Sequence, residues 1–248
     1  MVPYERRKEI IRLLEAKEIV TLEDFCELFL GVSESTIRRD LKALENEGRI
    51  DLLRGGAAKL KGGYYDTTVE SRNQLNVEEK ERIAKTAAEM VKDGDVVYID
   101  AGSTPLLMVK YLVDKRITIV STNTGIASAL QNSDIECILL GGQLNAKTAS
   151  VYGGMTDSFL RNLHFDKSFL GASGFSKNVG INTPDLSEAR KKQIVRDNSR
   201  KTYVLADSSK DGKETMCKIF DVGEVTIICD QETDTLIECG NYKIAGEI

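Results

Sequence analysis

The residues with the most specific chemistry lie in the segment SESTIRRDLKALENEG, residues 33–48. Arginine can pair bidentately with a guanine edge, and serine, threonine and lysine can hold phosphate oxygens of a nucleic acid. The segment predicts one helix, with Ser33 at its N-cap and Gly48 at its C′ position. Ile37, Leu41 and Leu44, at i, i+4 and i+7, would anchor one face to a core. We expect the opposite face to contact double-stranded DNA through Ser33, Ser35, Thr36, Arg38, Arg39 and Lys42.

The elements around this segment would position it as the second helix of a helix-turn-helix. Residues 21–31 predict a preceding helix, because Thr21 is a good N-cap and Asp24 stands at the capping-box position. Gly31 and Val32 leave a tight turn into the next helix, which is the arrangement of a helix-turn-helix unit. Its buried face would consist of Leu22, Phe25, Cys26 and Phe29.

Further elements on either side extend this unit to a winged helix. Residues 4–18 predict an upstream helix, and Pro3 suits its first position. Residues 49–60 predict two short strands around Gly55-Gly56, a wing on which Arg54 would contact DNA. Residues 1–60 therefore predict a winged helix-turn-helix domain.

Charge alone does not establish DNA binding. Residues 1–60 hold 11 Lys and Arg against 12 Asp and Glu, so this part of the chain is not basic as a whole. Its basic residues are concentrated in one short segment, where Glu34 and Asp40 interrupt them. A basic amphipathic helix is most often a solvated surface helix, and winged helices also serve as protein–protein adaptors. The outward Arg38, Arg39 and Lys42 favour DNA, and they predict an affinity that falls steeply with salt.

The rest of the chain predicts a second, larger domain. Residues 61–76 read as a linker and residues 77–248 as an α/β domain, in which short apolar runs alternate with helical stretches. Six of these runs predict strands: DVVYID, ITIVST, IECILLGG, KSFLGAS, KTYVLADS and VTIICD. That order favours a mainly parallel sheet covered by helices. The first helix would begin after Asn76, with Asn76 as its cap and Glu79 as the capping-box partner.

Polar residues follow several of the predicted strands. In parallel α/β sheets ligands bind beyond the carboxyl ends of the strands. Gly102-Ser103-Thr104 leads into a helix, where free N–H groups and hydroxyls would cradle a phosphate. Each such turn alone is more often structural than functional, but their recurrence at one edge predicts a polar ligand. The candidate effector residues are Asp100, Gly102, Ser103, Thr104, Thr122, Asn123, Gly141, Gly142, Glu188 and Lys210.

Composition excludes several other classes of protein. No apolar run approaches the roughly 20 residues of a membrane span, and no secretory signal is evident. The five cysteines form no C-x-x-C pair and suit reduced thiols in the cytoplasm. With His164 as the one histidine, a histidine-based metal site or a Ser-His-Asp triad is not expected. We therefore expect no metal, no cofactor and no membrane partner.

Residues 6–57 resemble the N-terminal domain of DeoR-family bacterial transcriptional repressors. One departure from the family pattern is Arg54, where the family usually has a histidine before the two glycines. The resemblance rests on Arg7, Ile10, Leu14, Ser33, Thr36-Ile37-Arg38-Arg39-Asp40-Leu41, Leu44, Gly48 and Gly55-Gly56-Ala57.

The second domain resembles the DeoR sensor domain, which is similar in fold to ribose-5-phosphate isomerase and commonly recognises phosphorylated sugars. The matching residues include Asp100, Gly102-Ser103-Thr104, Thr122-Asn123, Gly141-Gly142, Glu188-Ala189 and Asp207-Ser208-Ser209-Lys210. The resemblance implies a homo-oligomeric repressor, dimer or tetramer, of a carbohydrate-metabolism operon. It implies Ser103, Thr104 and Lys210 on the phosphate, and Asp100, Asn123 and Glu188 near the hydroxyls. The same two domains are also compatible with a transcriptional activator. The sugar could act either as an inducer or as a co-repressor.

The isomerase likeness makes an enzyme the second hypothesis. An aldose–ketose isomerase needs a base beside the carbonyl and groups that stabilise an enediolate, and Glu188 and Lys210 could serve. The isomerases, however, carry an acidic Asp-Gly-Ala-Asp loop, whereas residues 166–172 of this chain, DKSFLGA, keep one acid. We therefore expect binding without turnover.

Overall fold

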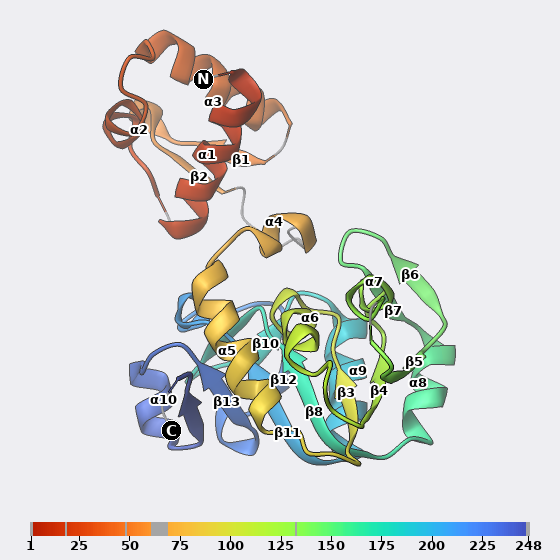
Figure 1. The fold of residues 1–248 in the computed structure, drawn as a ribbon. Coiled ribbons are helices and arrows are strands. Elements are labelled where there is room, and N and C mark those ends of the chain that lie inside the picture. Colours follow the sequence, from red (N-terminus) through yellow and green to blue (C-terminus); the bar gives the residue numbers. More distant parts are fainter. Residues whose placement is uncertain (1, 18, 48, 61–68, 132, 247–248) are drawn as a thin grey trace. The chain divides into compact units, whose positions relative to one another are not determined.

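A computed structural model describes residues 2–17, 19–47, 49–60, 69–131 and 133–246. The chain divides into two compact units, Met1–Tyr64 and Tyr65–Ile248. The first unit is helical with a small hairpin, and the second is built on one large sheet (Figure 1). The predicted fold class, a winged helix followed by a mainly parallel α/β domain, is confirmed.

The first unit contains three helices, α1 (Pro3–Ala16), α2 (Leu22–Leu28) and α3 (Glu34–Asn46). The predicted caps are present, because the Thr21 hydroxyl accepts from the N–H of Asp24 and Ser33 accepts from the N–H of Thr36. The α2 helix ends at Leu28, three residues before its predicted end, because Phe29 has already left helical geometry. The predicted role of Gly48 lies outside the described residues.

The core of the first unit joins all three helices and the hairpin. The hairpin consists of β1 (Ile50–Leu52) and β2 (Ala58–Leu60), which pair antiparallel with Ile50 opposite Leu60. Between them lies a short 3-10 turn, η1 (Arg54–Gly56), where Gly55 and Gly56 have φ of 85° and 86°. These angles favour glycine, so the wing needs both residues. The fully buried core side chains include Ile10, Leu14, Phe25, Ile37, Leu41, Leu44 and Ile50.

The second unit is organised by a seven-stranded sheet. Its strand order is β14-β13-β11-β8-β3-β4-β5, and every neighbouring pair is parallel. The strands are β3 (Val96–Ile99), β4 (Thr118–Ser121), β5 (Glu136–Leu139), β8 (Phe165–Gly171), β11 (Ser199–Leu205), β13 (Thr226–Cys229) and β14 (Tyr242–Ile244). The sequence predicted six of them and missed the short β14.

Two small antiparallel sheets accompany the large one, and the sequence predicted neither. One consists of β9 (Gly174–Ser176), β10 (Gly180–Thr183) and β12 (Cys217–Phe220), and the other of β6 (Gln143–Asn145) and β7 (Ser150–Tyr152). The remaining elements are α4 (Val69–Asn73), α5 (Val77–Glu89), α6 (Ser103–Met108), η2 (Val109–Tyr111), α7 (Ile126–Ala129), α8 (Gly154–Arg161), α9 (Leu186–Asp197), η3 (Ser208–Lys210), η4 (Val222–Glu224) and α10 (Asp234–Cys239).

Hydrophobic cores cover both faces of the large sheet. Alternate residues of β3 point to opposite faces, so Val97 and Ile99 pack with α5, α6 and α7, whereas Tyr98 packs with α8 and α9. Both faces are thus closed by helices, and ligands can reach the sheet at the ends of its strands.

Two predictions about the start of the second unit need correction. The described part of the predicted linker, residues 61–76, contains α4, which belongs to the second unit. Asn76 precedes α5 as predicted, but it has φ of 49° and makes no side-chain cap. Its amide instead donates to Oδ1 of Asp207 (2.8 Å) and to the hydroxyl of Ser209 (3.0 Å). A long-range polar contact has replaced the expected local one.

The described residues contain no group of three or more His, Cys, Asp or Glu side chains placed to hold a metal ion. Within the same residues, no helix is long and apolar enough to cross a membrane.

Candidate functional site

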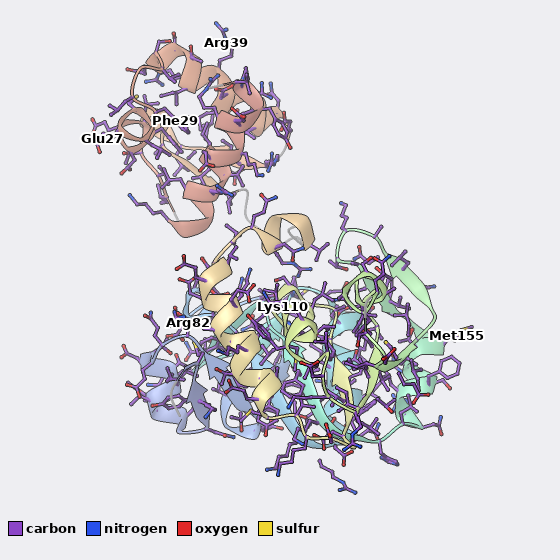
Figure 2. The ribbon with its side chains drawn as sticks, in the orientation of Figure 1. Glu27, Phe29, Arg39, Arg82, Lys110 and Met155 are labelled. Carbon is purple, nitrogen blue, oxygen red and sulfur yellow. The ribbon has the colours of Figure 1, made fainter. Side chains whose placement is uncertain are left out.

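The outward face of α3 carries exposed basic side chains. Arg39 points away from the first unit (Figure 2), and the structure records no hydrogen bond or ion pair for it among the described residues. Arg38 pairs with Glu34 one turn earlier (2.7 Å), and Lys42 pairs with Glu45. Pairs of this kind on an exposed helix are weak and can be exchanged for a phosphate. Arg39 is therefore the side chain of this face that is best placed to read a base.

Hydroxyl groups cluster at the start of α3. The hydroxyl of Ser33 lies 3.0 Å from that of Ser35 and 2.9 Å from that of Thr36. Ser33 and Ser35 are exposed, so the cluster can also reach an external phosphate. A helix N-terminus adds unpaired N–H groups and a partial positive charge to such a contact.

Asp40 was expected to interrupt the basic outward face of α3, but it does not lie on that face. It is 3% exposed, and its carboxylate contacts Arg6 (2.5 Å) and Arg7 (3.2 Å) of α1. This buried cluster fixes α3 against α1, so Asp40 positions α3 and does not belong to its outward face. Sequence reasoning missed Arg6, because its partner lies 34 residues away and an arginine on a helix is usually solvated.

The wing lies close to α3 through Arg38. A side chain at Gly56 would meet Nη1 of Arg38 at 2.9 Å and a methyl group of Leu22 at 3.3 Å. Arg54 is exposed at the tip of the wing, beside these glycines. Two guanidinium groups on α3, those of Arg38 and Arg39, and one on the wing, that of Arg54, are thus candidates to contact the same duplex.

In the second unit, the candidate effector residues lie beyond the carboxyl ends of the strands. Asp100 follows β3 and is fully buried. Its Oδ2 accepts from the N–H of Gly171 (2.9 Å) and pairs with the ammonium of Lys192, whereas Oδ1 has no hydrogen-bond partner in the described structure. An unsatisfied oxygen at full burial is costly, and a ligand hydroxyl would satisfy it.

The pKa of the Asp100 carboxyl reflects two opposing effects. Burial raises this pKa, but the attraction of Lys192 and Lys191, together with the hydrogen bonds from Lys192 and Gly171, outweighs burial and lowers it overall. Asp100 is therefore ionised at neutral pH. It can accept a hydrogen bond from a ligand but cannot donate one.

Glu188 belongs to the same buried charge cluster. It lies in the first turn of α9, and its Oε1 accepts from the hydroxyl of Ser150 (2.6 Å) and from Nζ of Lys191 (2.8 Å). Nζ of Lys192 lies 3.8 Å from Oε2 of Glu188 and also contacts Asp100, so it links the two carboxylates that the sequence proposed. Lys191 is fully buried and Lys192 is 5% exposed.

Sequence reasoning missed three members of this cluster, Ser150, Lys191 and Lys192. The spacing of Glu188, Lys191 and Lys192, i, i+3 and i+4, places them on one helix face. The same spacing is frequent on solvated helices, so it could not by itself reveal a buried site.

The other polar turns divide into two groups. Asn123 is buried beside Asp100, and its amide lies 3.5 Å from the carbonyl of Asp100. Thr122 is also buried, with its hydroxyl 2.8 Å from that of Tyr98. Gly141 and Gly142 lie apart from these contacts. The carbonyl of Gly141 accepts from the Thr156 hydroxyl (2.9 Å). A side chain at Gly142 would overlap that hydroxyl, so close packing against α8 explains Gly142, whereas a side chain at Gly141 would meet no atom within 4 Å.

Ser103 and Thr104 are buried in the first turn of α6, directly after Asp100 and Gly102. Lys210 lies in η3, beyond β11, and is half-buried. Burial raises the pKa of the neighbouring Asp207, but the charge of Lys210 and hydrogen bonds from Ser209 and Asn76 lower it overall. Within the described residues, no hydrogen bond or ion pair joins Lys210 to Asp100 or Glu188.

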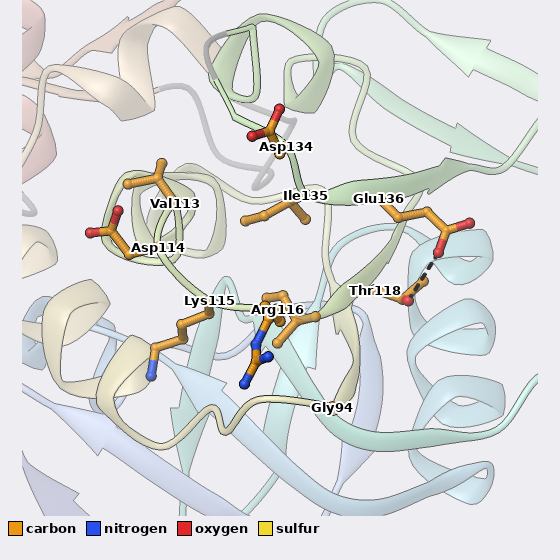
Figure 3. Close-up of a pocket in the computed structure, with 10 residues that line it drawn as sticks. Gly94, Val113, Asp114, Lys115, Arg116, Thr118, Asp134, Ile135 and Glu136 are labelled. Carbon is orange, nitrogen blue, oxygen red and sulfur yellow. Dashed lines mark hydrogen bonds between the residues drawn. The ribbon is translucent and has the colours of Figure 1, made fainter.

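A shallow hollow lies at the other edge of the sheet (Figure 3). Gly94, Thr118 and Glu136, which precede or begin β3, β4 and β5, line it with the turn 113–117. Its position at the amino ends of the strands separates it from the buried charge cluster, and its charged side chains are largely exposed. The hollow has no polar atom that is buried without a partner, so it is the weaker candidate for a ligand site.

Comparison with known families supports both units. The DeoR-like helix-turn-helix domain matches residues 6–61, and the DeoR C terminal sensor domain matches residues 75–231. The two matches together cover most of the described elements.

Individual proteins are similar along nearly the whole chain. An uncharacterized HTH-type transcriptional regulator, FruR, of Bacillus subtilis is 36% identical over 98% of this chain and 96% of its own length. The glycerol-3-phosphate regulon repressor of Escherichia coli is 32% identical over 92% of this chain and 90% of its own. Ribose 5-phosphate isomerase A of Methanocaldococcus jannaschii aligns with 60% of this chain and 57% of its own, at 22% identity and a TM-score of 0.41. That structural likeness is too distant to carry an argument about activity.

Proposed function

The chain belongs to the DeoR family of helix-turn-helix transcriptional regulators, and from this premise we propose that it represses a carbohydrate-metabolism operon under the control of a phosphorylated sugar. The observation that carries the proposal is the pairing of an exposed, arginine-bearing α3 with a second unit that holds a buried ionic cluster at the ligand edge of its sheet. Relatives named for a glycerol-3-phosphate regulon and an aga operon support a small phosphorylated carbohydrate.

In the DNA complex, α3 enters the major groove of a duplex operator. Arg39 reads a base edge, and Arg38 and Lys42 contact phosphates after their exposed intrahelical pairs dissolve. Arg54 contacts a phosphate from the wing. Ser33, Ser35 and Thr36 hold a phosphate at the N-terminus of α3. Asp40 keeps the helix in place through Arg6 and Arg7.

Arg39→Ala is expected to weaken binding to the preferred duplex by about 1–3 kcal/mol, roughly 5- to 150-fold in Kd, because one bidentate base contact is lost. Fluorescence anisotropy with duplexes selected from a random pool by the unmodified protein measures this loss. Arg12→Ala is the matched control, because Arg12 is a half-exposed arginine of α1 that pairs with Glu9. If the unmodified chain binds no duplex at low salt, the protein–protein adaptor becomes the better hypothesis.

The effector site is formed by the loops at the carboxyl ends of the strands. Ser103, Thr104 and Lys210 contact the phosphate, and Asp100, Asn123 and Glu188 contact the sugar hydroxyls. The unpaired Oδ1 of Asp100 supports this assignment, because it requires a donor such as a hydroxyl. Gly102, Thr122, Gly141 and Gly142 shape the surrounding loops.

A phosphorylated sugar at about 100 times its Kd is expected to stabilise the native sensor unit by about 2.7 kcal/mol. Thermal unfolding of the full chain with fructose 1-phosphate, fructose 6-phosphate, glucose 6-phosphate, ribose 5-phosphate and glycerol 3-phosphate measures this effect. The unphosphorylated compounds are the controls. Equal stabilisation by a free sugar would show that the phosphate group does not contribute to binding, and would contradict the proposed phosphate contacts.

The effector acts by changing how the sensor units of a cytoplasmic homo-oligomer hold their DNA-binding units. By linkage, an effector that weakens DNA binding must itself bind less tightly to the protein on DNA. The chain binds its sugar phosphate without turnover, since its relatives are transcriptional regulators. Isomerase activity that disappears in Glu188→Gln would favour the enzyme instead.

A further inference from the structure

The segment that opens the second unit covers the carboxyl edge of the sheet. The α4 helix packs against α6, and the N–H of Val69 donates to the carbonyl of Lys147 in the β6–β7 loop (2.8 Å). Asn76 contacts Asp207 and Ser209 after β11. Residues 69–80 therefore touch loops that follow three different parts of the sheet edge, and Figure 1 shows α4 beside α6 at this end of the unit.

Lys80 holds residues 72–75 of this segment through hydrogen bonds to their backbone. Its ammonium is buried and donates to the carbonyl of Leu75 (2.6 Å) and to the carbonyl of Arg72. Lys80 thereby satisfies one carbonyl group in the last turn of α4, that of Arg72, and one in the loop that follows, that of Leu75. The backbone of Arg72 is thus held over the sheet edge.

The guanidinium of Arg72 has buried nitrogen atoms that lack a hydrogen-bond acceptor. Its Nε and Nη2 atoms are buried, and neither has a hydrogen-bond partner in the described structure. No ion pair joins Arg72 to a carboxylate of the described residues, whereas Glu188 and Asp100 each pair with a lysine. Two guanidinium nitrogens that are buried without a partner are costly, and an anion would satisfy both of them.

The same edge holds a second unsatisfied buried group, Oδ1 of Asp100. Both groups belong to segments next to α6, since α4, which carries Arg72, packs on that helix and Asp100 precedes it in the chain. One group needs an anion and the other needs a hydrogen-bond donor. A ligand with a phosphate and a hydroxyl supplies both, and a guanidinium fork matches phosphate geometry.

We propose that Arg72 binds the phosphate of the effector and that this contact fastens α4 to the sensor site when the ligand binds. The proposal rests on the sugar-phosphate function proposed above and adds to it a ligand residue outside the strand-end loops. The α4 helix is the first described element after the wing strand β2, so a ligand that immobilises α4 fixes the point from which the DNA-binding unit is tethered. Effector binding would thereby reach the DNA-binding unit through the chain itself.

Arg72→Gln tests the contact, with Arg82→Gln as the matched control. Arg82 is an exposed arginine of α5 (Figure 2), so each variant removes one positive charge from one of the two helices that open the second unit. Inorganic phosphate and the sugar-phosphate panel are titrated against each full-length protein by thermal unfolding and calorimetry. We expect Arg72→Gln to weaken the responding ligand roughly tenfold to a hundredfold, Arg72→Lys to weaken it less, and Arg82→Gln to leave it unchanged.

The unliganded proteins distinguish a ligand contact from a structural one. An unpaired buried charge destabilises the empty protein, so Arg72→Gln should keep or raise its Tm without ligand. A Tm well below that of Arg82→Gln would show a structural role and overturn the proposal. Hydrogen exchange of residues 69–80 should slow when ligand binds the unmodified protein and stay fast in Arg72→Gln.

The outcomes separate this proposal from the sugar-phosphate function. If a sugar phosphate stabilises both Arg72→Gln and the unmodified protein equally, the Arg72 contact is wrong and the function stands. If no sugar phosphate binds but inorganic phosphate does, and only with Arg72 present, the anion site stands and the sugar function fails. If neither binds the unmodified protein, both proposals fail.

Discussion

Lys192→Met is expected to lower the free energy of unfolding of the sensor unit by about 3–5 kcal/mol, because it leaves Asp100 charged and buried without its main partner. Asp100 is fully buried, and its Oδ2 would keep the N–H of Gly171 alone. Methionine replaces the lysine stem with similar volume, so packing changes contribute little. The loss is therefore chiefly electrostatic.

Hydrogen exchange of the full chain measures this loss within residues 77–248, separately from the DNA-binding unit. Lys85→Met, an exposed lysine of α5 with no recorded partner in the described structure, is the control and should change stability by less than about 0.5 kcal/mol. The double variant Asp100→Asn/Lys192→Met should recover part of the loss, since the buried charge is gone. No recovery would contradict an electrostatic origin.

The pH dependence of the same pair has a definite sign. The pKa of Asp100 is lowered in the folded protein, so its contribution to stability is present above its unfolded pKa and is lost as pH falls through the folded value. Lys192→Met removes the strongest effect that opposes burial and leaves Lys191 and the N–H of Gly171, so we expect the pKa of Asp100 to rise and the penalty to appear as pH rises through the new value. The deficit of the variant relative to the unmodified protein should therefore shrink in acid.

Asp40→Ala is expected to destabilise the DNA-binding unit by about 3–5 kcal/mol, because it removes the carboxylate that two arginines of α1 share. Arg6 is 5% exposed, so water cannot replace that carboxylate fully. Loss of the cluster frees α3 from α1, and DNA binding should fall although Asp40 does not lie on the outward face.

Exchange of the amides of α1 and α3 measures this effect, and anisotropy measures the accompanying loss of DNA affinity. Glu47→Ala is the matched control, because Glu47 contacts Arg7 (3.2 Å) from an exposed position. An exposed pair contributes about 0–1 kcal/mol, so this control should stay close to the unmodified protein. Equal destabilisation in the two variants would show that the buried Asp40 cluster contributes no more to stability than the exposed pair of Glu47 and Arg7.

Short-range patterns in the sequence determined most of the elements. The caps at Thr21 and Ser33 formed as predicted, because an N-cap bonds to a backbone N–H only two or three residues away. The apolar runs of six sheet strands were also found, because a strand buried on both faces must be continuously apolar. The short β14 and the hairpin β6–β7 escaped, since three residues carry too little periodicity to be distinguished from a loop.

The position of charged side chains was decided by the tertiary structure. Asp40 was expected on the basic face but turns toward α1, and Asn76 was expected to cap α5 but reaches Asp207, 131 residues later in the chain. Lys192 meets Asp100 across 92 residues. A charged residue on a helix is solvated by default, so nothing in its local sequence shows that a distant group will bury it.

The sequence by itself therefore determined the family, the two kinds of domain and the loops that carry polar residues, because each depends on local spacing. Only the tertiary structure decided that Lys191, Lys192 and Ser150 join Glu188, and that two guanidinium nitrogens of the half-buried Arg72 are buried without a partner. Charge burial depends on which elements pack together, and desolvation makes each such contact either strongly paired or strongly unfavourable. The chemistry of the candidate effector site is thus a property of the fold.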